Sequence, residues 1–399
     1  MADAFLQGII EDCFRGISSP ITASASTSIF SPISVFSGGK MGALLDGLGW
    51  QNPSAPVGLW QDTGRTTPVT AAGQRVAAMD DSSGNNMHCI QGTINMQPTF
   101  VGVPTSLGSE LISDGGFATG APWTTGAGVS IAAGVATFTA SSGDLSQTVS
   151  VTSGKVYVLT YDIVSFTSGD IQPKFTGGTT TNSRVSRIVG SYYNFIRAEA
   201  GNTTFVITGI SATMSIDNVS LKEVLAWTGP YGLHSDGAND SLRTSSTHTL
   251  QLPAFLMMTW TPFMTINANG VFSDALDSSN QILLAPVSGL AYSRIRNAAG
   301  NLDFQSGAGQ IAIGTPAVWG SLHIVGTSDI QVNSNTLVSG ANTWLVGTQI
   351  LLSRFGLSAN TSQTDAGIFY GGIILLADPG ATNRAKLKTY FGAIAGLTL

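Results

Sequence analysis

The acidic residues of this chain do not form a recognisable catalytic pattern. Glutamate is rare, and it occurs only at Glu11, Glu110, Glu199 and Glu223. Hydrolysis of a glycosidic bond normally uses two carboxylates, one as the acid and the other as nucleophile or base. No expected strand carries two acids at alternate positions, and the sequence contains no Gly-x-Ser-x-Gly pattern of a serine hydrolase. We therefore expect that the protein is not an enzyme.

The histidines do not indicate a metal centre. His323 lies in an apolar run, so we expect a hydrogen-bonded core or interface residue. His234 and His248 flank a polar segment at Asp236–Asp240, and no third ligand lies at a spacing typical of zinc sites. Surface or packing positions are therefore the preferred interpretation for both. The polar segment itself is expected to be a structural turn rather than a ligand site.

Aromatic residues offer a binding chemistry instead. A sugar ring packs its C–H surface on an aromatic face, while Asn, Asp and Gln side chains bind its hydroxyls. Trp123, Tyr192 and Tyr193 are the candidates for such contacts. Adjacent residues of a strand point to opposite faces, so at least one of the two tyrosines should lie outside the core. It would then either contact a sugar or cover a surface between domains or subunits.

The composition favours a mostly β protein with polar but uncharged surfaces. Hydrophobic residues make up 43% of the 399 residues, whereas charged residues make up 10%, against an ordinary share of about 25%. This is too apolar for a disordered chain and too poor in charge for an all-helical one. The net charge is −6 and no run of Lys or Arg occurs, so nucleic-acid binding is not expected.

Other segments also limit the class of protein. The two cysteines allow at most one disulfide, so the fold does not depend on disulfides. No apolar run reaches the roughly 18 residues of a membrane helix, so we expect no membrane insertion. The first residues lack a basic region and include Asp3 and Glu11, which argues against a signal peptide.

The first 45 residues differ from the rest of the chain. Apolar residues recur there at helical spacing, at Phe5, Leu6, Ile9, Ile10, Cys13 and Phe14. The spacing predicts a short amphipathic helix, which either packs on its own domain or serves as a docking and oligomerisation helix. Residues 17–45 are rich in Ser, Thr, Pro and Gly and are typical of extended chain. We therefore interpret residues 1–45 as an anchor or oligomerisation segment.

The remaining chain is predicted to form a connector and two β-sandwiches. Residues 46–104 contain many turn signals and are expected to be a loop-rich connector. In 105–224, Tyr157, Leu159, Tyr161 and Ile163 alternate with residues of the opposite face, and Gly and Ser interrupt such runs about every ten residues. This pattern indicates an antiparallel sandwich. Residues 225–399 form a second strand-rich block, with one helix expected at 381–391.

Residues 105–224 resemble a known type of binding module. The opening run 110–117 (Glu-Leu-Ile-Ser-Asp-Gly-Gly-Phe), Trp123 and the closing run 215–221 (Ser-Ile-Asp-Asn-Val-Ser-Leu) resemble a carbohydrate-binding-module-like jelly roll that is common in phage proteins. The resemblance implies a structural Ca²⁺ between the first and last strands, where Asp114 and Asp217 would be its ligands. Turn hydrogen bonding by Asp217 is the alternative. No other cofactor is expected.

A second resemblance covers the C-terminal block. The runs 231–242, 367–376 and 384–391 resemble the concanavalin-A-like (laminin-G-like) lectin domain of phage structural proteins. Segments at 60–64, 68–74 and 81–86 resemble the connector that often precedes that domain. Together these resemblances imply an all-β virion protein, such as a tail fibre, tail spike or head fibre. Its two antiparallel β-sandwiches, a jelly roll and then a lectin domain, would follow the N-terminal helix and extended anchor.

The same resemblances imply partners and a location. The N-terminus would bind other capsid or tail proteins, the chain would form a homotrimer, and the sandwiches would bind a glycan of the host cell surface. The protein would be made in the host cytoplasm without a signal peptide and would reside in the virion. Two alternatives remain: an architectural capsid decoration protein that binds no glycan, and a polysaccharide depolymerase.

Overall fold

The fold is known from a computed structural model, which describes most of the chain after residue 40. The described residues are 41–45, 51, 54–82, 86–183, 186, 188–244, 248–263, 272–277, 280–287, 290–297, 300–305, 310–342, 349–352, 356–357 and 366–399. The predicted helix with Phe5, Leu6, Ile9, Ile10 and Phe14 lies outside these residues. The described chain is almost entirely strands joined by antiparallel pairing, as predicted from the composition.

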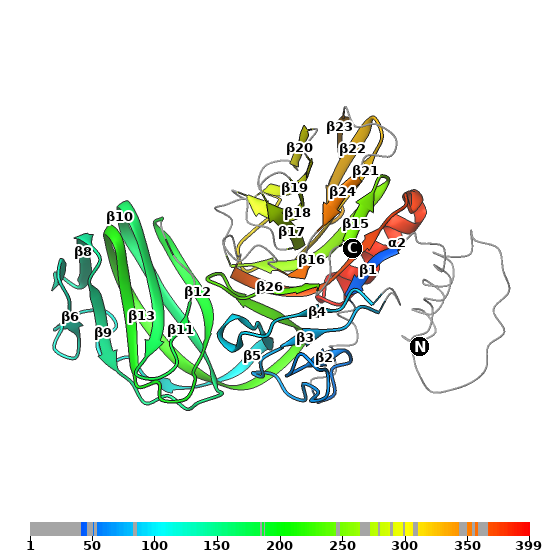
Figure 1. The fold of residues 1–399 in the computed structure, drawn as a ribbon. Coiled ribbons are helices and arrows are strands. Elements are labelled where there is room, and N and C mark those ends of the chain that lie inside the picture. The colour runs from blue at the N-terminus through cyan, green and yellow to red at the C-terminus, as the bar shows by residue number, and fades with distance from the viewer. Residues whose placement is uncertain are drawn as a thin grey trace.

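A jelly-roll sandwich occupies one side of the molecule (Figure 1). Its strands are β5 (Thr99–Glu110), β6 (Thr124–Thr125), β7 (Val129–Ala132), β8 (Val135–Ser141), β9 (Asp144–Thr148), β10 (Val156–Thr176), β11 (Thr181–Asn182), β12 (Gly190–Arg197) and β13 (Thr204–Asp236). Strand β10 pairs with β12 on one side and with β13 on the other.

The alternation predicted for 156–164 is confirmed, and at the start of the strand the second face is buried as well. Tyr157, Leu159, Tyr161 and Ile163 are buried between the two sheets of the jelly roll. The opposite face of β10 is also buried at its start, because Val156 and Val158 pack in a second cluster with residues of the C-terminal sandwich. A strand with two buried faces indicates that the jelly roll is packed against a neighbour there.

The second sandwich is built from the remaining strands and one helix. Its elements are β14 (Leu242–Thr244), β15 (His248–Gln251), β16 (Ala254–Pro262), β17 (Phe272–Asp277), β18 (Asn280–Val287), β19 (Leu290–Asn297), β20 (Gly300–Gln305), β21 (Ala317–Ile324), β22 (Thr327–Val332), β23 (Val338–Ala341), β24 (Gln349–Leu352), β25 (Gly356–Leu357), β26 (Ala366–Leu375) and α2 (Gly380–Ala393). The predicted C-terminal helix is thus confirmed as α2. Among the described helices, none has both the length and the apolar character needed to cross a membrane.

The residues interpreted as a connector contribute to this second sandwich. Their elements are β2 (Leu59–Trp60), β3 (Ala78–Met79), β4 (Cys89–Ile90) and a 3-10 turn η3 (Ile94–Met96). Strand β1 (Met41–Leu45), at the end of the segment interpreted as an extended anchor, pairs with β26 of this sandwich. Strand β4 pairs with β14, and Leu59 and Met79 are fully buried in one cluster with Trp260 and Trp319. The connector therefore closes one side of the C-terminal core instead of standing between two independent domains.

Two paired strands run through the boundary between the sandwiches without interruption. Strand β13 is 33 residues long, and β5 pairs with it from Lys222↔Glu110 to His234↔Thr99. The last residues of β13 then pair with β26, beside β16 in the C-terminal sheet. The boundaries predicted at 104/105 and 224/225 fall inside these strands. The two sandwiches are consequently joined by continuous sheet rather than by a flexible linker.

Candidate functional site

Of the three aromatic residues proposed to bind sugar, Trp123 is part of the jelly-roll core. Its side chain is only 7% exposed and packs on Phe117, with ring centroids 5.4 Å apart. The indole Nε1 donates a hydrogen bond to the carbonyl of Asp114 at 3.0 Å. Because no ring face is open to solvent, Trp123 stabilises the loop after the first strand rather than offering a platform for a sugar.

Tyr192 also points toward the jelly-roll core. Its ring stacks on Tyr161 with centroids 5.1 Å apart and an interplanar angle of 9°. The hydroxyl donates to the carbonyl of Ile188 at 2.6 Å and accepts the backbone N–H of the same residue. The Tyr192 side chain therefore fixes the segment before β12 against the core.

Tyr193 lies on the opposite face, as the alternation rule requires. It is 40% exposed, and it packs edge to face against Phe195 and against Phe263 of the second sandwich, at 5.5 Å in both cases. Trp227 and His234 also contact Phe195, at 5.3 Å each. Partial burial among these rings raises the pKa of Tyr193, so its phenol is a hydrogen-bond donor at neutral pH. Tyr193 is thus the solvent-exposed edge of an aromatic cluster between the sandwiches.

Polar side chains surround Tyr193 on three neighbouring strands. Thr160 of β10 is the cross-strand partner of both Tyr193 and Ser220, so the three share one face of the sheet. One row further along, Asp162 is opposite Ser191 and accepts a hydrogen bond from Asn218 Nδ2 at 2.8 Å. The sequence did carry a signal for these positions. Thr160 and Asp162 alternate with the core residues of β10, so they had to face outward.

The carboxylate of Asp114 accepts hydrogen bonds from backbone N–H groups of its own loop. Asp114 has a positive φ of 57°, and its oxygens accept the N–H groups of Ala118, Thr119 and Gly120 at 2.7–3.0 Å. These hydrogen bonds lower the pKa of Asp114. Asp217 accepts the N–H of Asn218 at 2.7 Å, which is the turn interaction considered as the alternative to calcium. In the described part of the chain no three acidic, His or Cys residues cluster as metal ligands.

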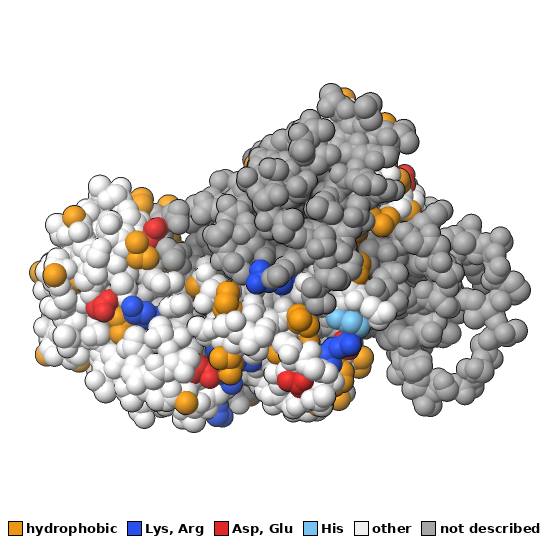
Figure 2. All heavy atoms as spheres, viewed as in Figure 1, with side chains coloured by type: hydrophobic (Ala, Val, Ile, Leu, Met, Phe, Trp, Pro, Cys, Tyr) orange, Lys and Arg blue, Asp and Glu red, His pale blue; other side chains and the backbone are white. Residues whose placement is uncertain are grey.

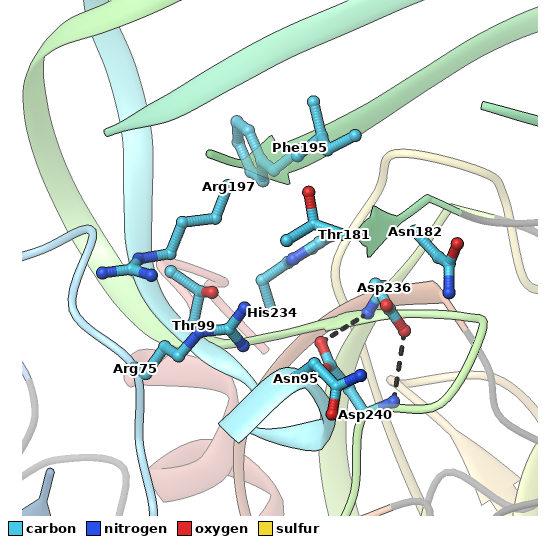
Figure 3. Close-up of a pocket in the computed structure, with 11 residues that line it drawn as sticks. Arg75, Asn95, Thr99, Thr181, Asn182, Phe195, Arg197, His234, Asp236 and Asp240 are labelled. Atoms are coloured by element: carbon cyan, nitrogen blue, oxygen red, sulfur yellow. Dashed lines mark hydrogen bonds between the residues drawn. The ribbon is translucent and has the colours of Figure 1, made fainter. Parts of the chain in front are cut away.

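A buried polar cluster joins the connector, the jelly roll and the second sandwich (Figure 3). Arg75 donates to Glu199 Oε1 at 2.9 Å and to the carbonyl of Gln97, and Arg197 donates to the same carboxylate and to the carbonyl of Gly73. Thus one carboxylate of the jelly roll holds two guanidinium groups. The cluster fixes how the three parts of the chain meet.

Two carboxylates and a histidine complete this cluster. Asp236 Oδ1 accepts the N–H groups of Ala238, Asn239 and Asp240, and Asp240 Oδ2 accepts the N–H of Asp236. This confirms that the segment is a structural turn. Burial raises the pKa of Asp240 well above its usual value, and the nearby Asp236 carboxylate raises it further. His234 bonds Asn194 Oδ1 at 2.7 Å, and burial lowers its pKa to about 3.

The cavity within this cluster is too small for a sugar. Its volume is about 20 Å³, which is enough for roughly one water molecule, whereas ligand pockets typically measure 300 Å³ or more. Arg75, Arg197, His234, Asp236 and Asp240 line it, and all of them already contact one another or the backbone. The cluster is therefore a structural junction rather than an active site.

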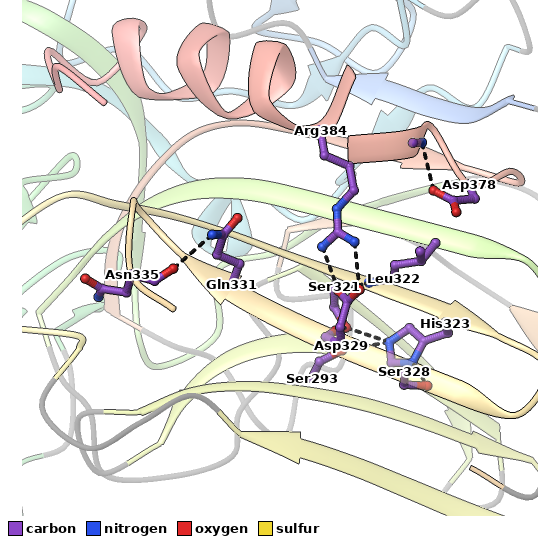
Figure 4. A network of polar contacts seen from close by, with 11 residues as sticks. Ser293, Ser321, Leu322, His323, Ser328, Asp329, Gln331, Asn335, Asp378 and Arg384 are labelled. Atoms are coloured by element: carbon purple, nitrogen blue, oxygen red, sulfur yellow. Dashed lines mark hydrogen bonds and ion pairs between the residues drawn. The ribbon is translucent and has the colours of Figure 1, made fainter. Parts of the chain in front are cut away.

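The second sandwich contains a further buried network, around His323 (Figure 4). His323 is fully buried, with Nε2 near the hydroxyls of Ser293 and Ser321 at 3.0 and 2.9 Å and Nδ1 near Ser328 at 3.0 Å. This confirms the prediction of a hydrogen-bonded core histidine. Among the described residues no carboxylate bonds the imidazole, and the adjacent Asp329 instead binds Arg384 of α2. The network thus lacks the acid that orients a catalytic histidine.

Comparisons with known proteins concern the sandwich fold. No protein-family model and no curated protein matches the chain. Among solved structures, the carbohydrate-binding module of a Ruminococcus gnavus sialidase, bound to α2,3 sialyllactose, is 5% identical, with a TM-score of 0.27 over 39% of this chain and 96% of that one. Domain 4 of the arabinanase AbnA from Geobacillus stearothermophilus is 14% identical, with a TM-score of 0.30 over 41% and 82%. Mouse laminin α1 domains LG4-5 are 10% identical, with a TM-score of 0.24 over 61% and 87%.

These similar proteins are carbohydrate-binding and laminin-G domains, and the likeness at such low identity extends to the fold alone. The chain itself is an antiparallel β-sandwich protein, with a jelly roll and a second sandwich. Its surface is consistent with the composition, because the described face in Figure 2 shows few charged side chains among many polar and backbone atoms.

Proposed function

We propose that the chain is a structural protein of a bacteriophage virion, a tail fibre, tail spike or head fibre. Residues 1–45 would anchor it to capsid or tail proteins, and the sandwiches would be displayed for adhesion to a host cell-surface glycan. The assignment to a phage comes from the sequence resemblances, and the glycan from the exposed aromatic and polar face around Tyr193. The homotrimer remains part of the same proposal.

The position of β1 is the observation that carries the proposal. β1 pairs with the C-terminal half of β26, where Met41 is opposite Leu375. Figure 1 shows β1 beside α2, on the side of the second sandwich away from the jelly roll. Residues 1–40 therefore join the described fold far from the jelly roll. An attachment there would leave the jelly roll as the part of the described fold that lies farthest from the particle.

The proposal includes no catalytic step. Asp236 and Asp240, the two acids of the polar turn, are both buried and hydrogen-bonded to backbone N–H groups. A polysaccharide depolymerase would need two carboxylates that reach a substrate. Release of sugar fragments from host polysaccharide by the purified protein would therefore overturn this part of the proposal.

Incorporation into particles tests the anchor. Particles assembled with the Phe5→Ala/Ile9→Ala double variant are expected to contain little of the protein, because these substitutions remove the apolar side of the predicted helix. Gln7→Ala is the matched control and should be incorporated as the unchanged chain is. Equal incorporation of the double variant would show that the N-terminal segment is not the anchor.

A glycan array with the full chain tests adhesion. Specific binding to one group of glycans supports the proposal. Failure to bind any glycan, with normal incorporation into particles, would instead establish the architectural alternative.

A further inference from the structure

We propose that the outer face of β12, β10 and β13 around Tyr193, hereafter the Tyr193 platform, binds a neutral glycan over a length of about two sugar rings. The platform consists of Tyr193, Thr160, Ser220, Ser191 and Asp162. This inference rests on the proposed adhesive function and names its ligand class and contact residues.

The platform has hydrogen-bonding groups that the protein does not use. Among the described residues, none forms a hydrogen bond with the side-chain hydroxyls of Thr160, Ser191 or Tyr193. The face is open, since Tyr193 is 40% exposed and Ser191 is also exposed. Hydroxyls beside an exposed ring can both donate to and accept from a hydroxyl-rich ligand.

The spacing of the strands sets the length of the ligand. Neighbouring strands lie about 4.8 Å apart, so the row Tyr193–Thr160–Ser220 extends for about 10 Å. This matches two linked pyranose rings. One ring would pack on Tyr193, and the next would lie over Thr160 and Ser220.

The charges of the platform argue for a ligand without acidic groups. Asp162 is the cross-strand partner of Asp217, and Ser220 donates to Glu110 Oε2 at 2.5 Å. Lys222 lies two residues from Ser220 on β13, and its ammonium lies 3.8 Å from the Glu110 carboxylate. Among the described residues named here the carboxylates outnumber the cations, so a uronic or sialic acid would meet like charge, which disfavours binding. A neutral sugar donates its hydroxyls to Asp162 without this cost.

The ring of Tyr193 is held in place by the second sandwich. Phe263 follows β16, and its ring meets that of Tyr193 at 83° with centroids 5.5 Å apart. Phe263 itself is only 6% exposed, so it cannot contact a ligand on this face. It is therefore a positioning residue, and the platform depends on both sandwiches.

The test compares binding of neutral and acidic glycans by the full chain and its variants, by glycan array and then by calorimetry with the best glycan. Tyr193→Ala should weaken binding at least about 30-fold, as expected when a central aromatic contact is removed. Thr160→Val should weaken it about 2- to 10-fold through one lost hydrogen bond. Thr208→Val is the matched control, because Thr208 lies on β13 twelve residues before Ser220 and its hydroxyl donates to Asp144 of β9.

Each outcome has a distinct meaning. Binding of neutral glycans that falls in Tyr193→Ala and Thr160→Val, but not in Thr208→Val, supports the platform. Binding that is unchanged in both platform variants, or that is confined to acidic glycans, overturns the platform while the adhesive function stands. No binding of any glycan by the unchanged, folded chain overturns both. Thermal unfolding of each variant shows whether it folds. If Tyr193→Ala does not fold, glycan binding by Thr160→Val and Ser191→Ala tests the platform instead.

Discussion

Arg384 of α2 donates to both carboxylate oxygens of Asp329 in β22, at 2.7 and 2.6 Å, and so fastens the only described long helix to the sheet (Figure 4). The guanidinium also lies over the ring of Phe255, 5.4 Å from its centroid. Both partners are largely buried, with side-chain exposures of 16% and 11%. Paired hydrogen bonds of this kind are among the stronger polar contacts in proteins.

Loss of this ion pair should destabilise the second sandwich. Arg384→Ala leaves the Asp329 carboxylate buried without its main cation, so we expect the free energy of unfolding to fall by about 3 kcal/mol. Lys388→Ala, on the same helix, is the control and should change it by less than about 0.5 kcal/mol. Chemical denaturation measures both. A similar small change in the two variants would mean that the pair does not hold α2.

Substitution of the adjacent glycines Gly115 and Gly116 tests how closely the Asp114 loop packs on Val219 in β13. A Cβ added to Gly115 would lie 1.9 Å from the carbonyl oxygen of Val219, whereas the nearest atom to one on Gly116 would be 4.0 Å away. The backbone cannot move there easily, since the N–H of Val219 donates to the carbonyl of Gly115. Gly115→Ala should therefore cost at least about 1–3 kcal/mol, and Gly116→Ala much less. Equal melting temperatures for the two variants would contradict this geometry.

The buried Asp240 of the polar cluster should make the free energy of unfolding depend on pH. Because burial raises the pKa of Asp240 above its unfolded value near 3.8, the folded protein holds this proton more tightly than the unfolded chain does. The associated stability is present below pH 3.8 and is lost as the pH rises through the folded pKa. Asp240→Asn removes this dependence while keeping an oxygen that can accept the N–H of Asp236.

The expected result is a variant that gains stability relative to the unchanged chain as the pH rises from about 4, by at most about 1.4 kcal/mol per pH unit. Denaturation at a series of pH values measures this difference. A constant difference between the two proteins from pH 4 to 8 would show that Asp240 does not titrate in this way.

The local structure was predictable from the sequence because it depends on neighbours along the chain. Alternation in 156–164 identified a strand and its core face, and the helix expected at 381–391 is present as α2. The adjacent pair Tyr192 and Tyr193 was correctly expected to divide between two faces. Trp123 and Tyr192 were also candidates for sugar contacts, but the indole holds the Asp114 loop and the Tyr192 ring stacks on Tyr161. Neither contact can be seen in the local sequence.

The junction between the sandwiches could not be predicted, because its contacts join residues far apart in sequence. Arg75 and Glu199 are separated by 124 residues, and nothing in either local pattern links them. The same is true of Tyr193 and Phe263. Alternation places Val156 and Val158 on the face of β10 opposite the jelly-roll core, but it does not show that the second sandwich buries them.

Because β13 is continuous through both sandwiches, it affects how several copies of the chain would bind one surface at the same time. A hinge between sandwiches would let each binding face search a wide volume and adapt to any receptor spacing. Continuous pairing of β13 with β5 and β26 removes that freedom, so in the proposed particle the binding faces would keep fixed separations and orientations. Avidity then rises steeply when receptors match those separations and is lost when they do not.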